Sequence, residues 1–231
     1  QHYLLRMDLF EEILNVPTDE GEMAVVIKQP VGSPATGRSW PTVMIMIDAP
    51  GIRKVTHEFM AKLASSGYRV ITPDLHHRQG RMVHVEPEQA AADPSLRGNV
   101  KGWIAAMTDE QIQRDIDQAL AATGVVHSSL GTIGFCLGAR AVVQAMTRLP
   151  DQFVCGAGWH PSFLADNKAD SPHRTPEQIV GDLYLGIGDA DQVQSIAMHQ
   201  RFLDATAEMP NVDVDIWAGA DHGFTWPGYA T

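Results

Sequence analysis

A short stretch in the middle of the chain, Gly134-Phe-Cys136-Leu-Gly138, has the residue types and spacing of a nucleophile. Its pattern G-x-C-x-G corresponds to the G-x-S-x-G turn that exposes a reactive side chain between a strand and a helix. Glycines on either side of the cysteine leave room for a sharp turn with a strained central residue. The sequence therefore predicts that Cys136 stands at a helix N-terminus, where the helix dipole favours a thiolate. The alternative is a structural cysteine in the core.

A histidine and two carboxylates follow in the order that such a nucleophile requires. Asp189 and Asp191 come after one apolar run, and His222 comes after the last apolar run. The order nucleophile, acid, histidine is that of the α/β-hydrolases. We expect His222 to be the base and one of the two aspartates to orient it. Each has a simpler alternative, because aspartates cap turns and helices and loop histidines are often solvated.

The elements that must position these groups alternate along the chain. Residues 8–16 and 22–29 are predicted to form an antiparallel pair of strands, and the later strands alternate with helices. This alternation predicts an α/β protein, a mostly parallel sheet with helices on both faces, formed by residues 1–231 as a single domain. In such a sheet reactive groups gather at the carboxyl ends of the strands. The later strands are expected at 42–48, 68–72, 130–135, 153–159, 182–186 and 212–217, and the helices at 57–66, 109–123, 139–148 and 195–209.

Two irregular regions are predicted to lie around this edge of the sheet. Residues 76–107 are expected to form a long loop or a short-helix excursion that covers a site, and residues 162–177 a loop. The histidines of the first region, His76, His77 and His84, lack cysteine or carboxylate at ligand spacing, so they are expected to lie on the surface or line a pocket, and no metal is predicted. Cys155, in an apolar run, is expected to be buried and inert.

Composition excludes several classes of function. Acidic residues outnumber basic ones by 28 to 17, which gives a formal charge of −11 and argues against a nucleic-acid partner. No apolar run approaches the roughly eighteen residues of a membrane-spanning helix, and no signal-like segment opens the chain. Two cysteines need no bridge in a chain of this length, so a reducing, cytoplasmic location is expected. The remaining class of partner is a small molecule, bound by a monomer or homodimer.

These motifs together resemble the dienelactone hydrolase (carboxymethylenebutenolidase-like) family of the α/β-hydrolase superfamily. The resemblance runs from about Asp8 to Tyr229 and depends on Gly-Phe-Cys136-Leu-Gly, the Gly-Tyr-Arg-Val-Ile-Thr-Pro-Asp-Leu segment near residue 70, the aspartate after the Tyr184 strand, and Asp-His222-Gly-Phe. It implies a three-layer α/β-hydrolase fold. It also implies that Cys136 is the nucleophile, His222 the base and Asp191, by spacing, the acid.

The resemblance implies further site residues and one departure. The amides of Ala49 and Leu137 would form the oxyanion hole. Asp48 stands where the family usually has a glutamate that contacts the thiol, and Arg78 matches one of two arginines expected to hold a substrate carboxylate. The second arginine is replaced by Trp226, which offers apolar stacking instead. His160 is expected to line the pocket.

The predicted activity is hydrolysis of a small ester or lactone through an acyl-thioester, without a cofactor. The loss of one cation implies that dienelactone itself is not the natural substrate or is bound differently. Two alternatives remain open: a thioesterase or acyl transferase on the same site, and a noncatalytic protein that keeps the pocket and binds a ligand.

Overall fold

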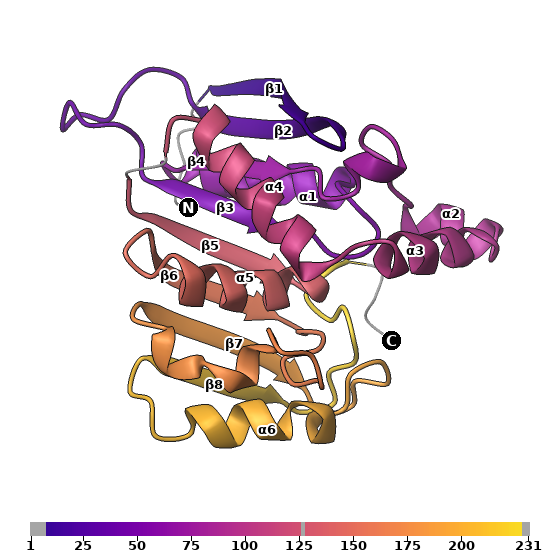
Figure 1. The fold of residues 1–231 in the computed structure, drawn as a ribbon. Coiled ribbons are helices and arrows are strands. Elements are labelled where there is room, and N and C mark those ends of the chain that lie inside the picture. The colour runs from indigo at the N-terminus through magenta and orange to yellow at the C-terminus, as the bar shows by residue number, and fades with distance from the viewer. Residues whose placement is uncertain (1–7, 126–127, 228–231) are drawn as a thin grey trace, which may run out of the picture.

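The structure is a computed structural model that describes residues 8–125 and 128–227. Its centre is an eight-stranded sheet with the strand order β1-β2-β4-β3-β5-β6-β7-β8 (Figure 1). Only β1 and β2, and β2 and β4, run antiparallel to each other, so the predicted mostly parallel α/β sheet is confirmed. The strands are β1 (Leu9–Thr18), β2 (Gly21–Pro30), β3 (Thr42–Met46), β4 (Arg69–Pro73), β5 (Leu130–Phe135), β6 (Phe153–Trp159), β7 (Asp182–Gly188) and β8 (Val212–Trp217).

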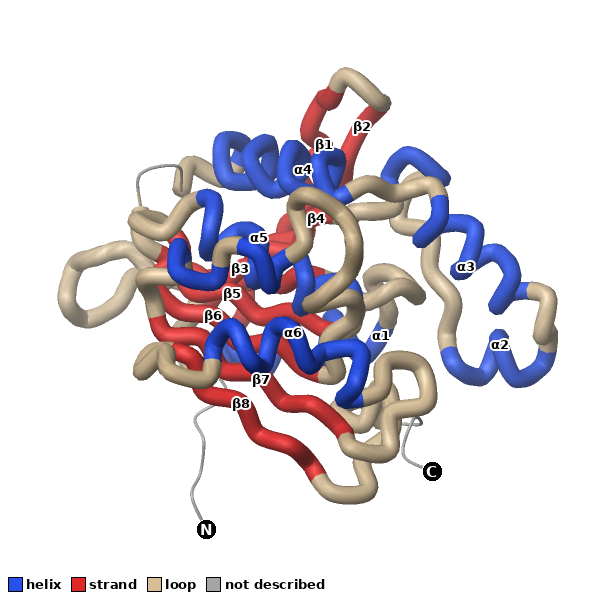
Figure 2. The backbone as a smooth tube through the Cα atoms, turned by 60° about the horizontal axis from the view of Figure 1, so that its bottom comes forward, coloured by secondary structure: helices blue, strands red, loops and turns tan. Residues whose placement is uncertain are grey.

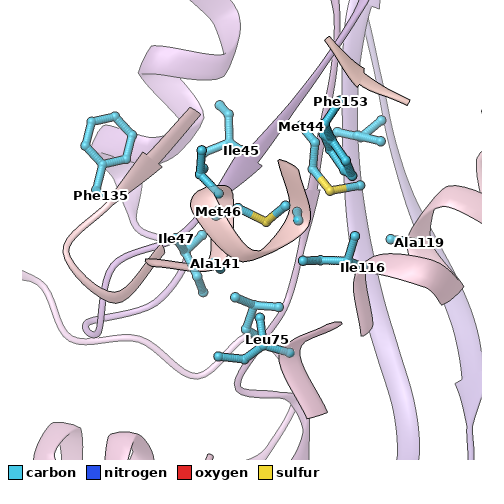
Figure 3. Packing of buried hydrophobic residues seen from close by; sticks show 14 of the residues in the cluster. Met44, Ile45, Met46, Ile47, Leu75, Ile116, Ala119, Phe135, Ala141 and Phe153 are labelled. Carbon is cyan, nitrogen blue, oxygen red and sulfur yellow. The ribbon is translucent and has the colours of Figure 1, made fainter. Parts of the chain in front are cut away.

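The central strands are apolar because both of their faces are covered. Every residue of β3 is buried, as its uninterrupted apolar sequence predicts. Met44, Ile45 and Met46 pack with Phe135 and Ile116 in the core shown in Figure 3. Because β3 and β5 are parallel and pair Met46 with Gly134, the residues that follow each strand emerge at the same edge.

Helices lie on both sides of this sheet (Figure 1). Helices α4 (Asp109–Ala122), α5 (Leu137–Arg148) and α6 (Ile196–Thr206) lie on one face, and α1 (Lys54–Ser65) lies on the other, near β2 and β4. Helix α4 begins where its cap predicts, since the Thr108 hydroxyl accepts a hydrogen bond of 3.2 Å from the Gln111 amide. No helix in the described ranges is long and apolar enough to cross a membrane.

The segment between β4 and α4 is the predicted excursion, and it is mostly helical. It contains a short 3-10 turn, η1 (His77–Gln79), followed by α2 (Pro87–Ala92) and α3 (Leu96–Ala105). Figure 2 shows α2 and α3 projecting from the side of the sheet. Neither helix has a fully buried side chain. Helices α2 and α3 are therefore covered less completely than the central helices of the fold.

The prediction that Cys155 is buried is wrong. Cys155 is exposed on β6. A Cβ placed on the next residue, Gly156, would contact Met146 of α5, so Cys155 faces away from that helix. On that side of the sheet Trp159 and Tyr184 are also only partly covered. An apolar strand sequence predicts strand formation, but the helices that pack on the sheet decide which face is buried.

Candidate active site

Cys136 occupies the sharp turn between β5 and α5. Its backbone has φ 54° and ψ −118°, a left-handed conformation that side chains rarely adopt. A Cβ on Gly134 would collide with the backbone of Gly138, and a Cβ on Gly138 would collide with the backbone after β3. Both glycines are thus required by close backbone approach. The turn places the partly exposed thiol at the N-terminus of α5.

Ser162 lies next to the sulfur of Cys136, although the sequence did not predict it as a site residue. Its Oγ lies 3.2 Å from Cys136 Sγ, and its amide donates a hydrogen bond of 3.0 Å to the Cys136 carbonyl. The side chain is buried. Ser162 follows the carboxyl end of β6, which is next to β5 in the sheet. This position after a neighbouring strand was the sequence feature that could have indicated Ser162 as a site residue.

His222 pairs with Asp191. The distance from His222 Nδ1 to Asp191 Oδ2 is 2.7 Å, and the other carboxylate oxygen accepts the amides of Val193 and Gln194. Asp189 instead is exposed and accepts the Gly219 amide at 2.6 Å. Of the two aspartates that the residue pattern left open, the one that contacts His222 is therefore Asp191.

The electrostatics of His222 tie the histidine to both Asp191 and Cys136. Burial by itself lowers the pKa of His222, but the hydrogen bond to Asp191 and the electrostatic interactions with Cys136 and Asp191 outweigh burial and raise this pKa to about 10. Burial raises the pKa of Asp191, but the hydrogen bond from His222 and the amides of Gln194 and Val193 bring this pKa below its ordinary value. The Asp191 carboxylate bonded to the imidazole favours the protonated form of His222.

The two amides expected to form an oxyanion hole are available. In the described part of the chain, neither the Ala49 nor the Leu137 N–H donates to a protein acceptor. The backbone of Ala49 is held at the next peptide group, because His76 Nε2–H donates to the Ala49 carbonyl at 2.8 Å. The His76 ring lies 5.3 Å from the Trp103 ring of α3. His76 is thus a supporting residue that the sequence did not reveal.

The histidines of the 76–107 segment have different environments. His76 and His77 are buried, contrary to the expectation of surface or pocket-lining groups, and His84 is exposed. They are buried because η1 turns the chain inward between the sheet and α4, where His77 Nε2 meets Asp115 at 3.3 Å. In the described residues no group of three or more His, Cys, Asp or Glu side chains is arranged to hold a metal.

Asp48 forms a buried pair with Arg53. Its carboxylate accepts a hydrogen bond from the Arg53 guanidinium, which lies 6.0 Å from the centre of the Trp226 ring. Burial raises the pKa of Asp48 to about 6, although the charge of Arg53 and the Trp226 indole act against this rise. Arg53 was not predicted, and it supplies a cation close to the tryptophan that replaces the expected arginine.

Trp226 and His160 pack against residues of the site. The Trp226 ring packs 4.1 Å from the Phe135 ring, and the His160 ring packs 5.1 Å from the His222 ring. His160 Nε2 bonds Thr225 Oγ1 at 3.0 Å, and burial and the charge of His222 lower the pKa of His160 to about 3. Both side chains are buried, so they present little surface to a ligand.

Arg78 belongs to a different cluster. Its guanidinium forms two hydrogen bonds with Asp115, of 2.7 and 2.8 Å, and a third of 2.8 Å with Glu20. Asp115 is a fully buried residue of α4. A hydrogen bond therefore joins Asp191 to His222, and electrostatic interaction links His222 to Cys136, whereas Arg78 pairs with carboxylates of the β1–β2 turn and of α4.

Comparisons with known proteins identify the family of the chain. A model of the dienelactone hydrolase family matches residues 25–230. A protein of Methylorubrum extorquens with the provisional name carboxymethylenebutenolidase is 26% identical over 220 residues, which cover 91% of this chain and 71% of the relative.

Solved structures show the same fold. A provisionally assigned dienelactone hydrolase of Klebsiella pneumoniae has a TM-score of 0.74 at 19% identity, covering 94% of this chain and 88% of the other. The dienelactone hydrolase-like promiscuous phosphotriesterase P91, from metagenomic libraries, has a TM-score of 0.71 at 18% identity, covering 95% and 85%. At these identities the likeness concerns the fold alone.

Proposed function

Because the chain belongs to the dienelactone hydrolase family, we propose that it is a cysteine-dependent hydrolase of small esters or lactones. Cys136 is the nucleophile, His222 the acid and base, and Asp191 the carboxylate that orients the imidazole. The observation that carries the proposal is the environment of His222, which bonds Asp191 at 2.7 Å and whose pKa is raised by both Asp191 and Cys136.

The first half of the reaction forms an acyl-enzyme. The Cys136 thiolate attacks the ester carbonyl carbon, and the negative charge that develops on the oxygen is held by the Ala49 and Leu137 amides. The carbon–oxygen bond to the leaving group then breaks, and the leaving oxygen takes the proton from the His222 imidazolium. The products of this half are an acyl-thioester on Cys136 and a free alcohol, or a ring-opened lactone.

The second half returns the enzyme to its starting state. Neutral His222 removes a proton from water, the hydroxide attacks the thioester carbonyl, and the carbon–sulfur bond breaks to release the acid. The thiolate and imidazolium are restored. Asp191 stabilises the imidazolium in both halves and does not itself take the proton. No step needs a cofactor, and a reducing location such as the cytoplasm keeps the thiol available.

A thiol-labelling and turnover experiment tests the proposal. Because Cys155 is exposed and would also react, the background is the Cys155→Ser variant. In that background Cys136→Ala should abolish both iodoacetamide labelling and hydrolysis of p-nitrophenyl acetate. Full turnover in Cys136→Ala would reject the cysteine mechanism. Binding of an ester without product in the Cys155→Ser parent would favour the noncatalytic alternative, and faster turnover of acyl thioesters than of esters and lactones would favour a thioesterase.

A further inference from the structure

A cavity of about 560 Å³ lies beside the first turn of α5. Its walls come from the end of α3, the start of α4, the start of α5 and the loop after β6. Half of the residues that line the cavity have apolar side chains. One of these residues belongs to α3, the helix that projects from the body of the protein in Figure 2. The apolar lining residues are Ile104, Met107, Ile112, Leu137 and Phe163.

The charged groups in this cavity neutralise one another. Arg140 donates to both oxygens of Asp109, at 2.9 and 2.8 Å, and lies 3.1 Å from Asp166. Lys168 adds a second cation 3.2 Å from Asp109. Each cation of the lining thus faces a carboxylate. An anionic ligand would have to compete with Asp109 and Asp166 for these cations, whereas an uncharged ligand leaves the pairs intact.

The cavity lies next to the turn that carries the nucleophile, and it is lined by sequence neighbours of Cys136 and Ser162 rather than by these two residues themselves. Leu137, whose amide is the proposed oxyanion donor, lines it, and so does Phe163, the neighbour of Ser162. Neither His222 nor Asp191 does. A leaving group must lie next to His222 to receive its proton, so the part of a substrate that enters this cavity is the acyl part.

We propose that this cavity binds the acyl group of the ester, and that the preferred acyl group is uncharged and apolar, with several carbons. The inference rests on the proposed cysteine hydrolysis and adds to it the class of substrate. Burial of methylene groups against the apolar walls supplies the preference, and the paired charges exclude acyl groups that end in a carboxylate.

The test varies the acyl group while the leaving group stays p-nitrophenol. For the Cys155→Ser protein, kcat/KM for the hexanoate should exceed that for the acetate by at least about tenfold. The mono-p-nitrophenyl ester of glutaric acid, which ends in a carboxylate, should be hydrolysed at least about tenfold less efficiently than the butyrate. Equal values for acetate and hexanoate, or a preference for the glutarate, would overturn the inference.

Variants at the end of α3 and in the linker that follows it test whether this cavity gives the preference. Ile104→Trp, and independently Met107→Trp, fill the cavity and should reduce the hexanoate-to-acetate ratio of kcat/KM by about tenfold or more. The matched control is Ala105→Trp, at an exposed position of the same helix, which should leave the ratio unchanged. An unchanged ratio in both filling variants would overturn the location. Acetate turnover that survives Cys136→Ala would instead refute the proposed function, whatever the ratio.

Discussion

The hydroxyl oxygen of Ser162 lies 3.2 Å from the sulfur of Cys136, and the Ser162 amide also holds the Cys136 carbonyl. A hydroxyl at this distance donates its hydrogen to a thiolate, and a hydrogen bond to a charged group is stronger than one between neutral groups. The nearby residues His160 and Phe163 have φ values of 38° and 55°. These conformations are unfavourable for residues other than glycine, so the loop holds Ser162 in place with some backbone strain. Ser162 is therefore placed to position the nucleophile.

Ser162→Ala should slow formation of the acyl-enzyme by about 10- to 150-fold, because loss of a hydrogen bond to a charged group costs about 1.5–3 kcal/mol. The burst of p-nitrophenol in the first turnover measures this rate. Ser162→Thr keeps the hydroxyl and should recover most of it. A burst in Ser162→Ala as fast as that of the parent would show that the contact plays no part in acylation.

Asp191→Asn and Asp189→Asn should differ strongly. The first removes the carboxylate that orients His222 and should reduce kcat by about 10²- to 10⁴-fold. The second alters only an exposed residue that caps the turn after β8, and should leave kcat within about threefold of the parent. The measurement is kcat of both variants and of the parent from steady-state kinetics at one pH. Comparable losses in the two variants would contradict the pairing.

His76→Leu should lower kcat by about tenfold or more while KM stays nearly constant. The Ala49 carbonyl would lose a hydrogen bond that helps to fix the backbone next to the Ala49 N–H, and an oxyanion donor acts mainly in the transition state. His84→Ala, which changes an exposed histidine of the same segment, is the control and should behave as the parent. A rise in KM with unchanged kcat would indicate that His76 serves ligand binding instead.

The stability contributed by His222 should depend on pH. Its pKa is about 10 in the folded protein and 6.5 ordinarily, so the folded state holds this proton more tightly than the unfolded chain. The contribution is therefore complete below about pH 6.5 and is lost as pH rises through about 10. The difference in Tm between the parent and His222→Gln should be largest near pH 6 and should shrink steadily up to about pH 10.5. A constant difference would contradict the raised pKa.

Cys155 should react with iodoacetamide in the native protein, but slowly. Burial and the nearby Asp182 charge raise its pKa, which lowers the fraction of thiolate. Mass spectrometry of the native protein should therefore show fast labelling at Cys136 and slow labelling at Cys155. Absence of any label on Cys155 would mean that this face of the sheet is covered in solution.

Much of the fold could be predicted because its signals are local. Apolar runs predicted the strands, and β6 and β8 have the predicted bounds. The N-cap at Thr108 and the glycines around Cys136 depend on interactions within a few residues or on backbone crowding at one turn, so the sequence determined α4 and the cysteine turn. Residue order along the chain also indicated Cys136, an aspartate and His222.

The tertiary structure decided the contacts between segments far apart in the chain. No local pattern relates Ser162 to Cys136 or Asp115 to Arg78, because these pairs are 26 and 37 residues apart and form only when separate elements of the fold come together. The exposure of Cys155 depends likewise on where α1 and α5 pack. Sequence by itself determined which groups could react. Packing determined which of them meet, because the distance between two side chains is set by every element that separates them.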